Sequence, residues 1–140
     1  MKIDDSIAGE LTTNFELAEW DHQVTVYGNV AFRTLRFIGR QRLPGHQHNF
    51  AHATEVVFGS IGLALLYPDG RREYFTGDSG DVFEVPAECK HVIWSRSENG
   101  AVCRCVFAVR DEDGGVVYQP TEKQKADRFW NERLGGGISP

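Results

Sequence analysis

The chain has 140 residues, 41% hydrophobic and 11% aromatic, which is enough for one compact domain with a buried core. Its net charge of −5 argues against a nucleic-acid partner, because nucleic-acid binders usually present a basic surface. It has neither the roughly 20 uninterrupted apolar residues of a membrane span nor the basic and then apolar start of a secretion signal, so we expect a cytoplasmic protein without a membrane partner.

The elements expected from Gln23 onward are short strands. Stretches rich in Val, Phe, Ile and Tyr alternate with turns rich in Gly, Pro, Asp and Asn, which is typical of an antiparallel sandwich or barrel. A hairpin is expected at Tyr67–Arg71, where Pro presets φ and Gly accepts a positive φ. The expected strands are residues 23–27, 30–38, 46–58, 62–67, 72–76, 81–85, 91–95, 101–109 and 115–119.

Near the C-terminus the pattern changes. Residues 122–134 contain no glycine and no β-branched residue, so we expect a short helix there. Its Phe129, Trp130 and Leu134 would dock on the barrel or on a second subunit. Residues 135–140 are glycine-rich and are expected to form a flexible tail.

The three cysteines, Cys89, Cys103 and Cys105, are an odd set that is hard to pair into disulfides, so reduced thiols are the simpler interpretation. Cys103 and Cys105 would share one face of a strand. They could offer two sulfur ligands to a metal, but buried free cysteines in a strand are commoner.

Histidines form the most informative pattern in the chain. Three of the five, His46, His48 and His52, fall within seven residues, and His91 lies further on. Neutral imidazole is the commonest nitrogen ligand of transition metals. Residues i and i+2 of a strand point to the same face, so His46 and His48 aim two rings into one space. His52 lies an even four residues beyond His48, and a regular or slightly bulged strand would return it to that side.

This arrangement resembles the first motif of the cupins, a superfamily of small β-barrels. That motif reads Gly, five residues, His-x-His, three or four residues, Glu, six residues, Gly. The chain matches it at His46, His48 and Gly59, and has His52 where the family usually has glutamate. Arg40 stands at the position of the opening glycine, so that part of the motif is missing.

The second cupin motif reads Gly, five residues, Pro-x-Gly, two residues, His, three residues, Asn. Gly80, Pro86 and His91 match it, whereas Glu88 and Ser95 replace the second glycine and the asparagine. Two motifs in the right order and at the right spacing make the resemblance specific for the fold.

The resemblance implies an all-β fold, the cupin double-stranded β-helix or jelly-roll barrel, with a short C-terminal helix. A single cupin domain would span residues 1–134, with its barrel core at about residues 30–110. The family also implies that ligands from both motifs converge on one metal. The ligands carried over by position are His46, His48, His52 and His91.

Histidine at position 52 changes the expected chemistry. With no carboxylate ligand the metal keeps its full charge of +2 and would attract an anionic substrate, such as an enolate or a carboxylate. An all-nitrogen set suits Fe, Ni, Zn or Cu, suits Mn less, and disfavours Ca and Mg. The alternatives are a three-histidine site with His52 as a second-shell donor or on the surface, and a cupin without metal.

Arginines within the expected strands are the candidates for binding a substrate carboxylate, since a guanidinium pairs with a carboxylate through two hydrogen bonds. Arg33 and Arg36 differ by three and face opposite ways, so at most one points into the barrel. Arg104 lies between Cys103 and Cys105 and either orientation is open. Apolar lining is expected from Phe50, Val56, Phe58, Phe83, Ile93 and Phe107.

The leading function is a small metal-dependent oxygenase of the dioxygenase type, acting on a small carbonyl, thiol or carboxylate substrate. The alternatives are a metal-dependent sugar or keto-acid isomerase or lyase, and a non-catalytic cupin that binds a small ligand, since a fold alone does not fix function. No residue stands out as a general base.

A homodimer is also expected. Cupins commonly dimerise, and the strand-like stretches within Phe15–Val26 have no obvious partner in the barrel. Trp20 and Trp130 would be natural anchors at such an interface.

Overall fold

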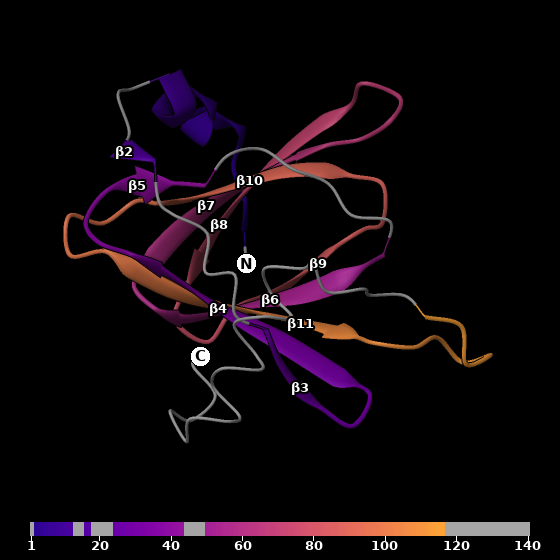
Figure 1. The fold of residues 1–140 in the computed structure, drawn as a ribbon. Helices are drawn as coiled ribbons and strands as arrows, with labels where there is room; N and C mark the ends of the chain where they lie inside the picture. Colours follow the sequence, from indigo (N-terminus) through magenta and orange to yellow (C-terminus); the bar gives the residue numbers. More distant parts are fainter. Residues whose placement is uncertain (1, 13–15, 18–23, 44–49, 117–140) are drawn as a thin grey trace.

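Two β-sheets packed against each other make up most of the part of the chain that the structure describes (Figure 1). The computed structural model describes residues 2–12, 16–17, 24–43 and 50–116. The six-stranded sheet, in the order β1-β8-β7-β10-β5-β2, contains β1 (Lys2–Ile3), β2 (Glu16–Leu17), β5 (Gln41–Arg42), β7 (Ser60–Leu66), β8 (Arg72–Asp78) and β10 (Lys90–Ser95). The five-stranded sheet, in the order β3-β4-β11-β6-β9, contains β3 (Thr25–Tyr27), β4 (Val30–Phe37), β6 (His52–Phe58), β9 (Val82–Val85) and β11 (Ala101–Ala108).

Nearly all neighbouring strands are antiparallel, and β2 with β5 forms a parallel pair. This arrangement confirms the expected all-β jelly-roll class. Side chains alternate between the two faces of each strand. In β11 the alternate residues Ala101, Cys103, Cys105 and Phe107 are buried between the sheets. The barrel interior is therefore the face on which functional side chains must be sought.

A short 3-10 helix, η1 (Asp5–Thr12), covers the outer side of the six-stranded sheet. Glu10 accepts hydrogen bonds from Trp94 Nε1 at 3.2 Å and from Arg96 Nε at 3.0 Å. Ile7 beside them is only 2% exposed. Trp94 follows the inward-facing Ile93 in β10, so it points to the outer face of the sheet. It is nevertheless fully buried, because η1 covers it. No helix among the described residues is long and apolar enough to cross a membrane.

Most of the expected strands lie within two residues of the observed ones. The last one differs, since Val116 makes only an isolated bridge with Arg110 and residues 117–119 lie outside the described residues. The expected strand over 46–58 is observed from His52 onward, and residues 44–49 lie outside the described residues. So do the expected C-terminal helix, the tail, Trp20 and Trp130.

The expectation that Phe15–Val26 has no strand partner is wrong. β2 pairs with β5 at Glu16 and Leu17, and β3 pairs with β4 at Thr25 and Val26. Both segments extend sheets of the same chain, so they supply no argument for a dimer.

The sequence analysis expected Phe58 to line the interior, but this side chain is 53% exposed. The cause is a register shift. Val102 pairs with Phe58, but the next residue, Cys103, pairs with Val56. The extra residue on β6 is a bulge, which turns the end of this strand outward.

The contact between Gly62 and Trp94 gives a testable prediction for stability. These residues are direct cross-strand partners, and a Cβ on Gly62 would lie 2.2 Å from two atoms of the buried indole ring. Overpacking a rigid site costs about 1–3 kcal/mol. We expect Gly62→Ala to lower the free energy of unfolding by this amount in urea denaturation.

Gly9→Ala is the matched control, since a Cβ there meets nothing within 4 Å. Equal stabilities of the two variants would show that Trp94 is not held over Gly62.

Candidate functional site

Two histidines from opposite sheets meet inside the barrel. His52 is the first residue of β6 and is 5% exposed, and His91 on β10 is 1% exposed. Their ring centroids lie 5.2 Å apart, with the planes at 56°. The rings of Phe50 and Phe107 lie 5.1 Å apart and Phe50 lies 6.4 Å from His52, which gives this end of the barrel an apolar wall.

The ring of His91 is oriented by the backbone. Its Nδ1 lies 3.0 Å from the carbonyl oxygen of Cys89. A carbonyl can only accept a hydrogen bond, so Nδ1 carries the proton and the buried Nε2 holds the lone pair. Histidines that bind metals characteristically donate their other N–H to such a carbonyl, which fixes the tautomer. Nε2 is therefore the His91 atom whose lone pair a metal or a hydrogen-bond donor would use.

Electrostatics keep this ring neutral. Burial lowers the pKa of His91, the hydrogen bond with Cys89 opposes that shift, and the charge of Arg33 lowers the pKa further. The neutral imidazole is the form that ligates metals.

The geometry of this pair fits a shared metal ion. With metal–nitrogen bonds of about 2.0–2.1 Å, two imidazoles in neighbouring coordination positions have centroids roughly 4.5–5.5 Å apart. The observed 5.2 Å lies in this range. The other two expected ligands, His46 and His48, lie outside the described residues. Within the residues that are described, no three side chains of His, Cys, Asp or Glu form a group that could hold a metal.

Two positions of the second motif have a left-handed backbone. Gly80 has φ of 94° and Glu88 has φ of 61°, both in the left-handed region. This conformation is easy for glycine and strained for glutamate. The turn that contains Glu88 leads into His91 on β10.

Only one of the three candidate arginines faces the interior. Arg33 lies on the same face of β4 as Ala31 and Leu35, which are buried, and its own Nε is also buried. Arg36 and Arg104 are exposed on the outer face, and Arg104 is a direct cross-strand partner of Glu55 there. The sequence left open which of these arginines points into the barrel, and in the structure it is Arg33.

A polar row crosses the five-stranded sheet beside the histidines. Arg33 pairs with Cys105, and Cys105 pairs with Thr54. The Thr54 hydroxyl lies 3.5 Å from Cys105 Sγ, and Thr54 is fully buried. The sequence analysis did not single out Thr54. The sequence does place Thr54 on the same face of the strand as His52, because the two residues are two positions apart. Its neighbours Cys105 and Arg33 follow only from the strand pairing.

The cysteines behave as core residues. All three are free, as expected from the sequence, and all three are buried, which the sequence analysis expected only of Cys103 and Cys105. Burial raises the pKa of Cys103 and of Cys105, although Thr54 and the charge of Arg33 oppose the shift at Cys105. Metals bind the thiolate rather than the thiol. The structure thus favours packing over sulfur ligation for this pair.

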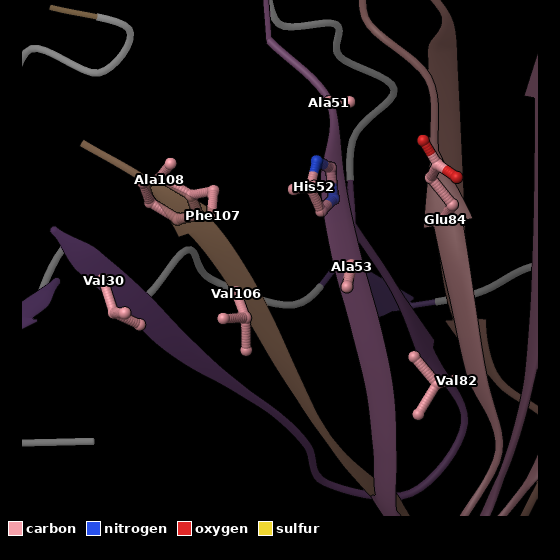
Figure 2. Close-up of a pocket in the computed structure, with 9 residues that line it drawn as sticks. All are labelled: Val30, Ala51, His52, Ala53, Val82, Glu84, Val106, Phe107 and Ala108. Atoms are coloured by element: carbon pink, nitrogen blue, oxygen red, sulfur yellow. The ribbon is translucent and has the colours of Figure 1, made fainter. Parts of the chain in front are cut away.

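A pocket of about 490 Å³ lies along the outer face of the five-stranded sheet (Figure 2). Strand alternation places Ala53, Val82, Glu84 and Val106 on the face opposite to His52. The lining is largely apolar. His52 and Phe107, whose side chains face the interior, also line this pocket. Its lining residues are Val30, Ala51, His52, Ala53, Val82, Glu84, Val106, Phe107 and Ala108.

Several solved structures share this fold, and one of them is named as a cupin domain. A cupin domain from Bordetella pertussis matches with a TM-score of 0.52 and 17% identity, over 69% of this chain and 97% of that one. Bacillus subtilis oxalate decarboxylase, which has Mn(II) centres, matches with a TM-score of 0.52 and 22% identity, over 79% of this chain and 31% of that one. Drosophila melanogaster CENP-C bound to CAL1 matches with a TM-score of 0.51 and 17% identity, over 58% of this chain and 65% of that one.

No protein-family model and no curated protein sequence matches the chain. The chain spans 65% of the CENP-C chain and about a third of oxalate decarboxylase. At these identities the likeness establishes the cupin fold.

Proposed function

We propose that this protein with the cupin fold is a metal-dependent enzyme, an oxygenase that acts on a small carbonyl, thiol or carboxylate substrate. One divalent transition metal would be bound in the barrel by His46, His48, His52 and His91. The observation that supports this proposal most strongly is the buried contact of His52 with His91 across the two sheets.

The donor set supports a transition metal. Neutral nitrogen ligands suit Fe(II), Ni(II), Zn(II) or Cu(II) and leave the ion with its full charge. Such an ion supplies Lewis acidity, and iron or copper also supplies reactivity with oxygen. That the fold accommodates a metal is supported by the Mn(II) centres of oxalate decarboxylase.

The chain itself contributes binding and exclusion of water. Arg33 brings a permanent positive charge to the interior, beside Cys105. Burial is the main cause that lowers the pKa of His91, and the charge of Arg33 lowers it further. A guanidinium binds a carboxylate through paired hydrogen bonds. The rings of Phe50 and Phe107 keep the same end of the barrel apolar. The site thus suits a small anionic substrate.

Oxygen dependence separates the leading function from the alternative. A metal-dependent isomerase or lyase uses the ion only as a Lewis acid, so its turnover continues without oxygen. Turnover by an oxygenase stops under anaerobic conditions and resumes when oxygen is admitted. Turnover that persists anaerobically would assign the site to the isomerase or lyase class.

The metal proposal predicts the behaviour of histidine variants. We expect the wild type to bind one equivalent of Zn(II) in isothermal titration calorimetry. His52→Ala and His91→Ala each remove one ligand and should weaken binding on the order of 100-fold or more.

His22→Ala is the matched control, because His22 lies outside both cupin motifs, and we expect wild-type affinity. His91→Ala with wild-type affinity would contradict the proposal.

Arg33 gives a separate prediction for substrate class. With Zn(II) bound, malonate should bind more tightly than its neutral analogue malonamide. Arg33→Gln should weaken malonate binding about 10- to 100-fold, because a charge-assisted hydrogen-bond pair is lost. Malonamide binding should be unaffected.

The control is Arg104→Gln, which removes an exposed guanidinium on the outer face. Equal losses for Arg33→Gln and Arg104→Gln would show that net charge, rather than the interior position, governs anion binding. Thermal melts establish that each variant is folded.

A further inference from the structure

The pocket on the outer face of the five-stranded sheet combines an apolar lining with one acidic side chain, that of Glu84 on β9 (Figure 2). None of the lining residues that the structure describes is a lysine or an arginine. The volume of about 490 Å³ lies in the range of small-molecule sites, roughly 300–1,000 Å³. The composition and size of this pocket therefore suit a small ligand that is apolar and carries a positive charge.

Strand pairing explains how the floor of the pocket is built. Val106 on β11 is the cross-strand partner of Ala53 on β6, and Ala53 is the partner of Glu84. Cross-strand partners have side chains on the same face, and neighbouring strands are about 4.8 Å apart, so this row runs roughly 10 Å across the sheet. Figure 2 shows Ala53 between Val106 and Glu84. The short side chain of this alanine leaves space above the middle of the row.

Larger apolar side chains border this row. Val82 lies two residues before Glu84 on β9 and is 54% exposed, and Val30, at the start of β4, is 47% exposed. Single exposed apolar residues are ordinary on a protein surface, but these two line the same pocket. An apolar ligand that covers them removes apolar surface from water, which favours binding.

The charge of Glu84 is not balanced as that of another acid on this face is. Glu55 on β6 is the direct cross-strand partner of Arg104. The cross-strand partner of Glu84 is Ala53, and within the described part of the chain no lysine or arginine forms an ion pair with it. Its carboxylate is therefore available to a cation that comes from outside the chain.

We propose that this pocket binds a small organic cation, a primary ammonium with an apolar body up to about 10 Å long, the length of the row. The ammonium donates hydrogen bonds to the Glu84 carboxylate. The apolar body lies over Ala53 and Val106. This ligand is opposite in charge to the substrate proposed for the interior, and its site requires no metal. The inference therefore stands independently of the proposed function.

Three probes with the same apolar body test the charge preference on metal-free protein by NMR titration. Phenylbutylammonium is a cation, phenylbutanol is neutral and phenylpentanoate is an anion. We expect the cation to bind about 3- to 10-fold more tightly than the alcohol, because a charged hydrogen bond to a partly exposed carboxylate adds a modest free energy. The anion should bind most weakly. Equal affinities for the cation and the alcohol would overturn the role of Glu84.

Variants separate the pocket carboxylate from net charge. Glu84→Gln should remove the preference for the cation and leave the affinity for phenylbutanol unchanged. Glu98→Gln is the matched control, because it removes the same charge from an exposed position in the turn between β10 and β11. It should keep the preference of the wild type. Equal loss of preference in both variants would show a general charge effect and overturn the proposal.

The place of binding is tested in two ways. Ala53→Phe fills the floor of the pocket from the outer face, so it should abolish binding of the cation and the alcohol, with a thermal melt to establish folding. In the wild type, the amide signals of Ala53, Glu84 and Val106 should shift when the cation is added, a result that does not depend on the folding of any variant. Shifts confined to other residues would overturn the proposal. So would shifts of these signals with protein concentration alone, which would indicate that a second copy of the chain covers the pocket.

Discussion

The contact between His52 and His91 is the constraint on which the rest of the structure depends. Two polar rings are placed in the buried interior, where a polar group is costly to bury unless it is hydrogen-bonded. The Cys89 carbonyl orients one of the rings. Fully buried apolar neighbours, such as Val56 and Leu63, supply the opposing stabilisation, with roughly 1.5–3 kcal/mol for each large side chain. The packed core thus holds the sheets at a distance that brings the rings together.

Charges around this contact are arranged asymmetrically. The five-stranded sheet contributes the guanidinium of Arg33, whose Nε is buried. In the proposed site, neutral ligands would leave a bound metal fully charged. Together with the charge of Arg33, that metal would favour an anionic ligand.

The sequence predicts the major strands well, because glycine and proline turns separate stretches of β-forming residues. Residues that match both cupin motifs can also be recognised in the sequence, and Glu88 has a left-handed backbone, which glycine adopts more readily. Two-residue strands such as β5 leave too little pattern to be predicted. The orientation of Arg33 depends on strand register, which a single sequence does not reveal.

X-ray absorption spectroscopy of the protein loaded with one equivalent of Zn(II) tests the central claim most directly. It reports the atoms bound to the ion and recognises imidazole by scattering from the outer ring atoms. A site built from His46, His48, His52 and His91 predicts four nitrogen ligands, all from imidazole, and one fewer imidazole in His91→Ala. A sulfur ligand, or a shell of oxygen without imidazole, would contradict the account.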